Sequence, residues 1–335
     1  IPTPTPIPPT PQPTTPPFTG DYLSARLQFP VEVRPDAGFT RYLITVPLLN
    51  GGQVLANMRD NVSYSPYMLY PQGIMYGGQS QIELDVATIQ SVGLTAQQAK
   101  ALQYVSTHEG KFDAINSYDK AIFSYGFIQF TGAAAVGASL NRVMASMKTY
   151  APAAFQRVFQ RVGIDSEGSV TAPTTTVLSD NGAKLRGDEA WLYIQRNIRM
   201  YGAFVQAGFE PSLVREQLRM ANTLYIQTAL NFKLDVILGG LRVVIPRLGD
   251  ILSSEAALTA VFAIAINQGV GGMSRIVSSA VGVVGTQNGL TSPQTLSRVD
   301  EQQVVQYIAT THADERVRTR AQGVLNSDLS FGKNS

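Results

Sequence analysis

A glutamate at the end of a predicted helix is the residue of this chain best suited to chemistry. Leu102, Val105 and Glu109 are spaced i, i+3 and i+7, so a helix would place all three on one face. Leu102 and Val105 should point into the core, which leaves the Glu109 carboxyl at the core's edge. Partial desolvation there would raise its pKa, and a protonated carboxyl can act as general acid on a glycosidic oxygen. The alternative is an ordinary solvated glutamate at a helix end.

The polar loop after this glutamate supplies further candidates. Asp113 and Asp119 lie four and ten residues beyond Glu109. Either carboxylate could activate water or stabilise an oxocarbenium ion, whereas the alternative is that both only form Asx-turns. The loop also carries side chains suited to hydrogen bonding with a sugar or stacking on it: Asn116, Ser117, Tyr118, Ser124 and Tyr125.

The sequence HEGKFDAINSYDKAIFSYGFIQF, residues 108–130, resembles the signature of the lysozyme-like superfamily, especially goose-type lysozymes and soluble lytic transglycosylases. The shared pattern is a helix-terminal glutamate, a short loop and a Gly-apolar-apolar-Gln turn, here Glu109 and residues 126–129. The segment is more similar still to bacterial peptidoglycan hydrolases with E-G-x-F-D-A-x-N-x-Y-D followed by G-F-I-Q-F. Weaker similarity extends over residues 100–330 and does not cover residues 1–90.

The resemblance implies a role for each matching residue. Glu109 would be the general acid. Asp119 would be the best second carboxylate, and Asp113 is a further catalytic candidate. Gln129 would hold the loop or contact an acetamido group of the sugar. Asn267 would lie in the groove, or else cap a buried helix. With the loop residues suited to a sugar, the candidate substrate-binding residues are Asn116, Tyr118, Ser124, Tyr125, Gln129 and Asn267.

One departure from the pattern leaves the reaction open. Phe112 and Asp113 stand where transglycosylases have a Ser-rich stretch after the glutamate. Hydrolysis and anhydro-sugar formation are therefore both compatible with the sequence. Peptidoglycan is the expected substrate, and a chitin- or chitosan-type polymer is the other possibility.

The composition excludes several other classes of function. The formal charge is +2 over 335 residues, which gives no reason to expect a nucleic-acid partner. The chain has no cysteine and two histidines, which argues against thiol catalysis and against a metal site, so we expect no cofactor. The longest apolar run, residues 256–266, is shorter than the roughly 20 residues of a membrane-spanning helix, so no span is predicted.

The chain divides into three predicted parts. Residues 1–20 form a Pro/Thr-rich arm, with nine prolines and six threonines in residues 1–19. This arm is either a spacer after an export signal or a contact to a neighbouring subunit of a homo-oligomer. Residues 21–90 form a β-rich segment, either a small domain or a wrap on the main domain. Residues 91–335 form an α-helical lysozyme-like domain, so the predicted fold class is mainly α.

Helices are predicted through most of that third part. Thr95 and Gln98 make a capping-box signature for a helix that ends at Glu109, before Gly110. Residues 164–187 are predicted to be a connection. Further helices are predicted at 131–149, 152–163, 188–207, 211–238, 254–267, 270–284 and 292–324.

The leading hypothesis is an exported glycan-cleaving enzyme of the cell envelope or extracellular space. Its main alternative is a structural subunit of an extracellular assembly built on a lysozyme-like scaffold, with the Pro/Thr arm making subunit contacts. The low charged fraction, 15% against about 25% in average proteins, keeps that alternative open. A third hypothesis is a noncatalytic wall-binding module.

Overall fold

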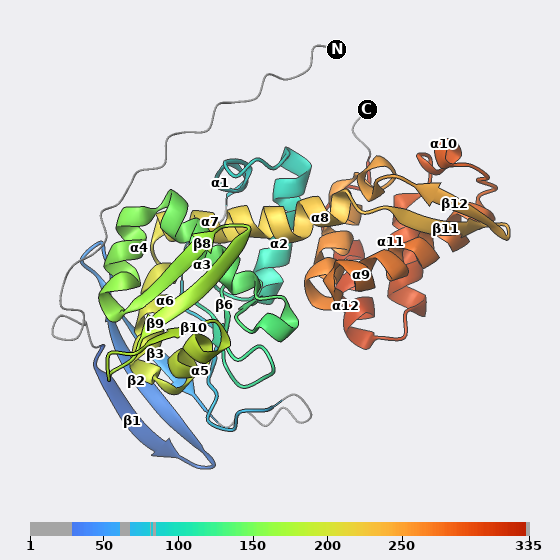
Figure 1. Ribbon diagram of the computed structural model, residues 1–335. Helices are drawn as coiled ribbons and strands as arrows, with labels where there is room; N and C mark the ends of the chain where they lie inside the picture. Colours follow the sequence, from blue (N-terminus) through green and yellow to red (C-terminus); the bar gives the residue numbers. More distant parts are fainter. Residues whose placement is uncertain (1–28, 61–67, 81, 83–84, 333–335) are drawn as a thin grey trace, which may run out of the picture.

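Helices and antiparallel strands are interleaved along the chain and form a larger and a smaller lobe (Figure 1). The computed structural model describes residues 29–60, 68–80, 82 and 85–332, with His108 and Glu109 described by their backbone alone. The Pro/Thr arm therefore lies outside the described residues. The structure is 49% helix and 19% strand, and the largest of its sheets among the described residues has seven strands. The prediction of a mainly α fold is wrong, because antiparallel sheet is a substantial part of the architecture.

The seven-stranded sheet follows sequence order from β1 to β7, and all neighbouring strands are antiparallel. On β3 the side chains alternate between the two faces, and Ala56 and Met58 are buried. The sheet continues past residue 90 into the loop after α2. Its strands are β1 (Val31–Asp36), β2 (Phe39–Pro47), β3 (Gln53–Arg59), β4 (Met75–Tyr76), β5 (Ile115–Asn116), β6 (Ser124–Tyr125) and β7 (Phe130–Thr131).

The helix that carries the candidate acid forms as predicted. In α2 (Ala96–Glu109), Thr95 Oγ1 accepts from the Gln98 N–H at 3.3 Å, and Gln98 Oε1 accepts from the Thr95 N–H at 3.2 Å. The predicted capping box is therefore confirmed. Leu102 and Val105 are buried, so the predicted helical phase places these two residues in the core. The helix ends at Glu109, where Gly110 turns to extended backbone.

An aromatic cluster fixes the larger lobe around the loop that follows α2. The ring of Phe204 lies 4.6 Å from that of Phe123 and 5.2 Å from that of Tyr125, centroid to centroid. Trp191 stacks on Phe123 at 5.6 Å. These rings join β6 to helices far along the chain. The helices of this lobe are α1 (Val86–Gln90), α3 (Ser139–Tyr150), α4 (Pro152–Val158), α5 (Asp188–Arg196), α6 (Tyr201–Gly208), α7 (Pro211–Ala221) and α8 (Gln227–Leu230).

The predicted connection at 164–187 contains a three-stranded sheet. Its strands are β8 (Ile164–Ser169), β9 (Ala172–Leu178) and β10 (Lys184–Arg186), with β9 in the centre. Thr175, Thr176 and Val177 are buried on β9, and β-branched residues fit a half-buried strand well. Ser166, Gly168 and Ser169 lie within β8 and pair with β9, so these Gly and Ser residues do not prevent a strand.

The helix predicted over 211–238 forms as far as Leu230, but the prediction is wrong for its last residues. Its end forms β11 (Leu234–Leu238), which pairs with β12 (Leu241–Ile245) around Gly239 and Gly240. Both glycines have positive φ, 53° and 87°, as a two-residue hairpin turn requires. Alternating apolar residues on each side of a Gly-Gly pair are a hairpin signal, which outweighs the helical periodicity here.

The smaller lobe is built around the long helix α9 (Glu255–Gln287). This helix is long and apolar enough to cross a membrane by length and composition, but 61% of its most apolar window is buried within the protein. Gly269, with φ 68° and ψ 164°, breaks the helix. α9 packs against α2, β11 and α11, so it joins the two lobes. The other helices of this lobe are α10 (Pro293–Leu296), α11 (Glu301–Thr311) and α12 (Glu315–Leu325).

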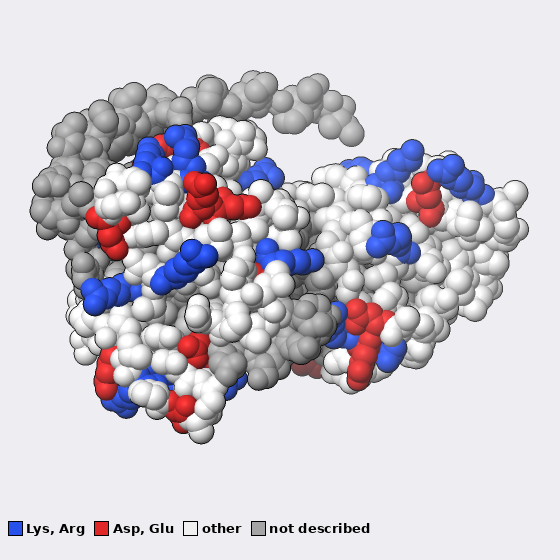
Figure 2. Space-filling model, turned by 60° about the horizontal axis from the view of Figure 1, so that its bottom comes forward, with Lys and Arg blue, Asp and Glu red and all other residues white. Residues whose placement is uncertain are grey.

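Charged residues are scattered over the surface. On the face in Figure 2, basic and acidic side chains alternate, and large areas carry neither. Several ion pairs among the described residues join two exposed side chains, such as Arg34 with Glu32 and Arg242 with Asp235. Exposed pairs of this kind contribute little to stability. No strongly basic face is seen in this view that would follow a phosphate backbone.

Candidate functional site

A hollow of about 370 Å³ lies beside the C-terminal end of α2. Residues on both sides of Glu109 in the sequence line it, because the helix and the following turn form one wall. Ser80, Ile82 and Asp85 form the opposite part. The remaining lining residues are Gln103, Ser106, Thr107, Gly110, Lys111, Phe112 and Phe127. The backbone of Glu109 thus ends its helix at this hollow, while its side chain lies outside the described part of the structure.

Asp113 is completely buried and belongs to the core. Its carboxyl oxygens accept hydrogen bonds from Tyr76 Oη at 2.8 Å, from the Gln79 N–H at 2.9 Å and from the Ser80 N–H at 2.8 Å. Burial, together with the charge of Asp113, raises the pKa of Tyr76. Asp113 does not line the hollow. We therefore assign it a structural role, which is to hold residues 76–80 against the loop.

Asp119 lies in a local turn. Its Oδ1 accepts from the Ala121 N–H at 2.9 Å, and its carbonyl oxygen accepts from the Ile122 N–H at 3.0 Å. This is the Asx-turn that the sequence left open as the alternative. The turn leads into Ile122, a β-branched residue with φ 62°. Asp119 is half-buried and does not line the hollow.

Most of the predicted sugar-binding residues are part of the small strands. Ser124 and Tyr125 are buried on β6, and burial raises the pKa of Tyr125 far above its usual range. Asn116 is half-buried on β5, opposite Ser124. Tyr118 is half-buried, and its carbonyl oxygen accepts from the backbone N–H groups of residues 69 and 70 at 2.8 and 2.9 Å. The structure thus brings these residues together in the small strands and their turns, and none of them is among the residues that line the hollow.

Gln129 holds the turn before β7. It has a left-handed φ of 55°, and its Nε2 donates to the carbonyl oxygen of Gly126 at 2.9 Å. This contact fits the first of the two roles implied for Gln129, holding the loop. A non-glycine residue with positive φ costs free energy and persists only where its surroundings impose it.

Gly126 fits this turn because it has no side chain. A Cβ there would lie 2.1 Å from Gln217 Oε1 and 3.0 Å from Gln217 Cδ. Gln217 cannot easily move, since it is fully buried and its Nε2 donates to the carbonyl oxygen of Phe112 at 3.0 Å. Gly126 and Gln217 therefore couple the turn to Phe112, which lines the hollow.

We expect Gly126→Ala to lower the free energy of unfolding by roughly 2–4 kcal/mol, because it combines left-handed strain with overpacking. Gly137→Ala is the matched control, since Gly137 has φ 93° but a Cβ there would meet no atom within 4 Å. That control should cost about 1 kcal/mol. Urea unfolding of both variants measures the difference, and equal losses would show that Gln217 yields to the new methyl group.

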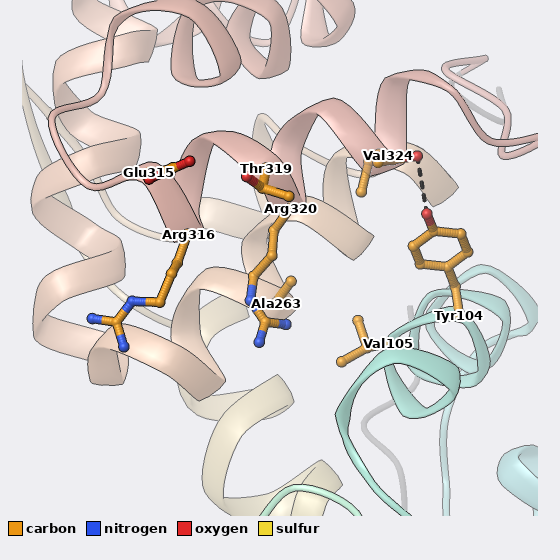
Figure 3. Close-up of a pocket in the computed structure, with 9 residues that line it drawn as sticks. Tyr104, Val105, Ala263, Glu315, Arg316, Thr319, Arg320 and Val324 are labelled. Carbon is orange, nitrogen blue, oxygen red and sulfur yellow. Dashed lines mark hydrogen bonds between the residues drawn. The ribbon is translucent and has the colours of Figure 1, made fainter. Parts of the chain in front are cut away.

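Asn267 lies at a second cleft, on α9, away from the loop. With its amide oxygen facing α12, it accepts from Arg320 Nε at 2.8 Å and from Arg320 Nη2 at 2.6 Å. Arg320 lines a cleft of about 450 Å³ together with Tyr104 and Val105 of α2 (Figure 3). Asn267 is thus next to a groove, although this groove does not include Asp119 or Gln129.

Asp85 is the functional candidate that the sequence analysis missed. It caps α1: Asp85 Oδ1 accepts from the Thr88 N–H at 2.5 Å. Hydrogen bonds from Thr88, first from its backbone, hold the pKa of the Asp85 carboxyl below its usual range, so it is ionised near neutral pH. An Asp just before a helix start is a recognisable capping signal, but its place across from the end of α2 depends on the tertiary fold.

Comparisons with known proteins identify no relative. No protein-family model, no curated protein and no solved structure matches this chain. Among the described residues, no group of three or more His, Cys, Asp or Glu side chains is arranged to hold a metal ion. The resemblance to the lysozyme-like superfamily therefore stays a prediction from the motif at 104–130.

Proposed function

We propose that this protein is an exported glycan-cleaving hydrolase that acts on peptidoglycan, with Glu109 as the general acid. The observation that supports the proposal most is the hollow beside the C-terminal end of α2, the helix whose last residue is Glu109. Short strands β5–β7 follow directly, and Gln129 ties their last turn. A helix-terminal glutamate beside an open hollow is the arrangement that a glycosidase needs to admit a polymer.

In this proposal the reaction uses two carboxyl groups with different protonation. Protonated Glu109 donates its proton to the bridging oxygen as the bond to the anomeric carbon breaks. Positive charge then develops on the sugar ring, and an ionised carboxylate stabilises it or activates the attacking water. Asp85 lines the hollow and has a lowered pKa, so we propose Asp85 for this second role. Asp119 is the other candidate.

We expect Asp85→Asn to reduce glycan cleavage by about 10²-fold, within the range for one acid–base group. Asparagine caps a helix as well as aspartate does, so the melting temperature should stay unchanged. Because the pKa of Asp85 is lowered, the native enzyme should keep activity as the pH falls below the usual aspartate range. The Asp85→Asn variant should lose this low-pH part of the pH–rate profile. Rates measured against pH check this, with Asp119→Asn as the matched control. A loss with Asp119→Asn alone would transfer the role to Asp119.

The direct test of the proposed function is release of soluble muropeptides from purified peptidoglycan. New reducing ends would indicate hydrolysis, and anhydro-sugar ends would indicate transglycosylation. Chitosan and chitin serve as comparison substrates. A native protein that releases nothing from any of these polymers would overturn the proposal.

A further inference from the structure

The second cleft has a composition typical of a small-molecule site. It lies between α2, α9 and α12, and its volume of about 450 Å³ falls within the range of ligand pockets. The side of the cleft formed by α2 and α9 is largely apolar, with Tyr104, Val105 and Ala263. On the α12 side lie the donors Arg316, Thr319 and Arg320, together with Val324 and the carboxylate of Glu315.

Arg320 is held in a fixed position in this cleft. The amide oxygen of Asn267 accepts from both Nε and Nη2 of its half-buried guanidinium, at 2.8 and 2.6 Å. Next to it, Gln268 Nε2 donates to Asp314 Oδ2 at 3.1 Å, so α9 is joined both to the middle of α12 and to its N-cap residue. Both contacts directly precede the break of α9 at Gly269. A guanidinium oriented in this way loses less conformational freedom when it pairs with an anion.

The charges around the cleft favour an anionic ligand. Figure 3 shows Arg316 and Arg320 extending from the same side of α12, with Glu315 directed away from them. Arg316 is exposed, and its Nη2 makes a long contact of 3.5 Å to Asp314 Oδ2. The exposed Thr319 adds a hydroxyl between the two arginines along α12. Arginine pairs with carboxylates through parallel hydrogen bonds, and the apolar wall suits an aliphatic body.

We propose that this cleft binds the carboxylate-bearing peptide of a muramyl glycopeptide. Arg320 pairs with the carboxylate, and Tyr104 and Val105 contact the aliphatic part of the peptide. The inference rests on the proposed function, because α2 forms this wall and also ends in Glu109. Val105 precedes Glu109 by four residues, about 6 Å of helix. The cleft would make the enzyme select acidic glycopeptides over neutral chitin-like chains.

Calorimetric titration of the full-length Glu109→Gln protein tests the site without cleavage. The probes are N-acetylmuramyl-L-alanyl-D-isoglutamine, which carries a carboxylate, and neutral N,N′-diacetylchitobiose. We expect Arg320→Gln to weaken binding of the muramyl dipeptide at least tenfold, since a charge-assisted bidentate pair is lost. Binding of the chitobiose should not change. Added salt should weaken the binding of the muramyl dipeptide and leave the binding of the chitobiose unchanged.

Further variants separate binding from folding. Thr319 is exposed, so Thr319→Glu adds a negative charge to the cleft without disturbing the core, and it should also weaken the dipeptide. Arg242→Gln on the distant hairpin and Thr310→Glu on α11 repeat the two charge changes at exposed positions and should have no effect. Thermal melting checks that all four variants fold.

The outcomes distinguish this site from the proposed function. Muramyl dipeptide binding that depends on Arg320 supports the cleft, even where the native protein cleaves no peptidoglycan. If the muramyl dipeptide binds equally well to the protein with Arg320 and to the Arg320→Gln variant, or binds to neither, the cleft proposal is overturned. This holds even where Glu109 proves catalytic. If Arg320→Gln weakens chitobiose binding as much as dipeptide binding, the cleft proposal is also overturned, because the selectivity would not come from the carboxylate.

Discussion

Glu109→Gln is expected to reduce muropeptide release from peptidoglycan by about 10²- to 10⁴-fold, the range that a general acid contributes. Glutamine keeps the size and hydrogen bonding of the side chain, but it cannot transfer a proton to the leaving oxygen. A negative charge at a helix C-terminus is disfavoured by the helix dipole, so this substitution should not destabilise the fold. Chromatography of products from native and variant protein, at equal concentration, measures the loss.

A matched control makes this result specific. Glu189 is exposed in the first turn of α5, and Glu189→Gln makes the same chemical change away from the hollow. It should leave the rate unchanged. If Glu109→Gln retains native activity, Glu109 is not the acid, whatever the substrate. If the native protein is inert on peptidoglycan and chitosan alike, the structural-subunit hypothesis becomes the leading one, and the Pro/Thr arm becomes the segment to test for subunit contacts.

Local signals in the sequence predicted the helix that carries the candidate acid. The capping pair Thr95 and Gln98, the buried phase of Leu102 and Val105, and the stop at Gly110 all depend on residues within one or two helical turns. Such signals are encoded in the segment itself, so they can be identified without the fold. The same reasoning failed at 234–238, where the end of the predicted helix is instead a strand that pairs with residues 241–245 around Gly239 and Gly240.

The burial of the candidate carboxylates could not be predicted in this way. Asp113 and Asp119 both follow the glutamate in a polar loop, and nothing local separates them. Asp113 is buried because donors from residues 76–80, more than 30 positions earlier, converge on it. Asp85 reaches the hollow because α1 packs against α2. Both facts depend on long-range packing, which determines which carboxyl faces solvent and which becomes structural.

Removing the buried carboxyl should have the largest effect on stability. We expect Asp113→Ala to lower the free energy of unfolding by roughly 3–5 kcal/mol, because it leaves three donors without their acceptor at about 1–3 kcal/mol each, partly offset by relaxation. These donors are Tyr76 Oη and the N–H groups of Gln79 and Ser80. The neighbouring Gly208 approaches Asp113 so closely that a Cβ there would lie 2.4 Å from the aspartate Cβ. Alanine keeps this Cβ, so the contact with α6 remains and the expected loss comes from the unpaired donors.

Urea denaturation of Asp113→Ala and Asp119→Ala tests this assignment on two aspartates of the same loop. Asp119 makes a single side-chain contact to the Ala121 N–H, so its loss should cost about 1 kcal/mol or less. Ser80 lines the hollow and its Oγ donates to the carbonyl oxygen of Gly208 at 2.7 Å, so Asp113 positions one wall of the proposed active site. Asp113→Asn keeps one acceptor and should fall between the native protein and the alanine variant. If Asp113→Ala proves as stable as Asp119→Ala, the carboxyl does not hold this wall, and Asp113 returns to the candidates for the second catalytic carboxylate.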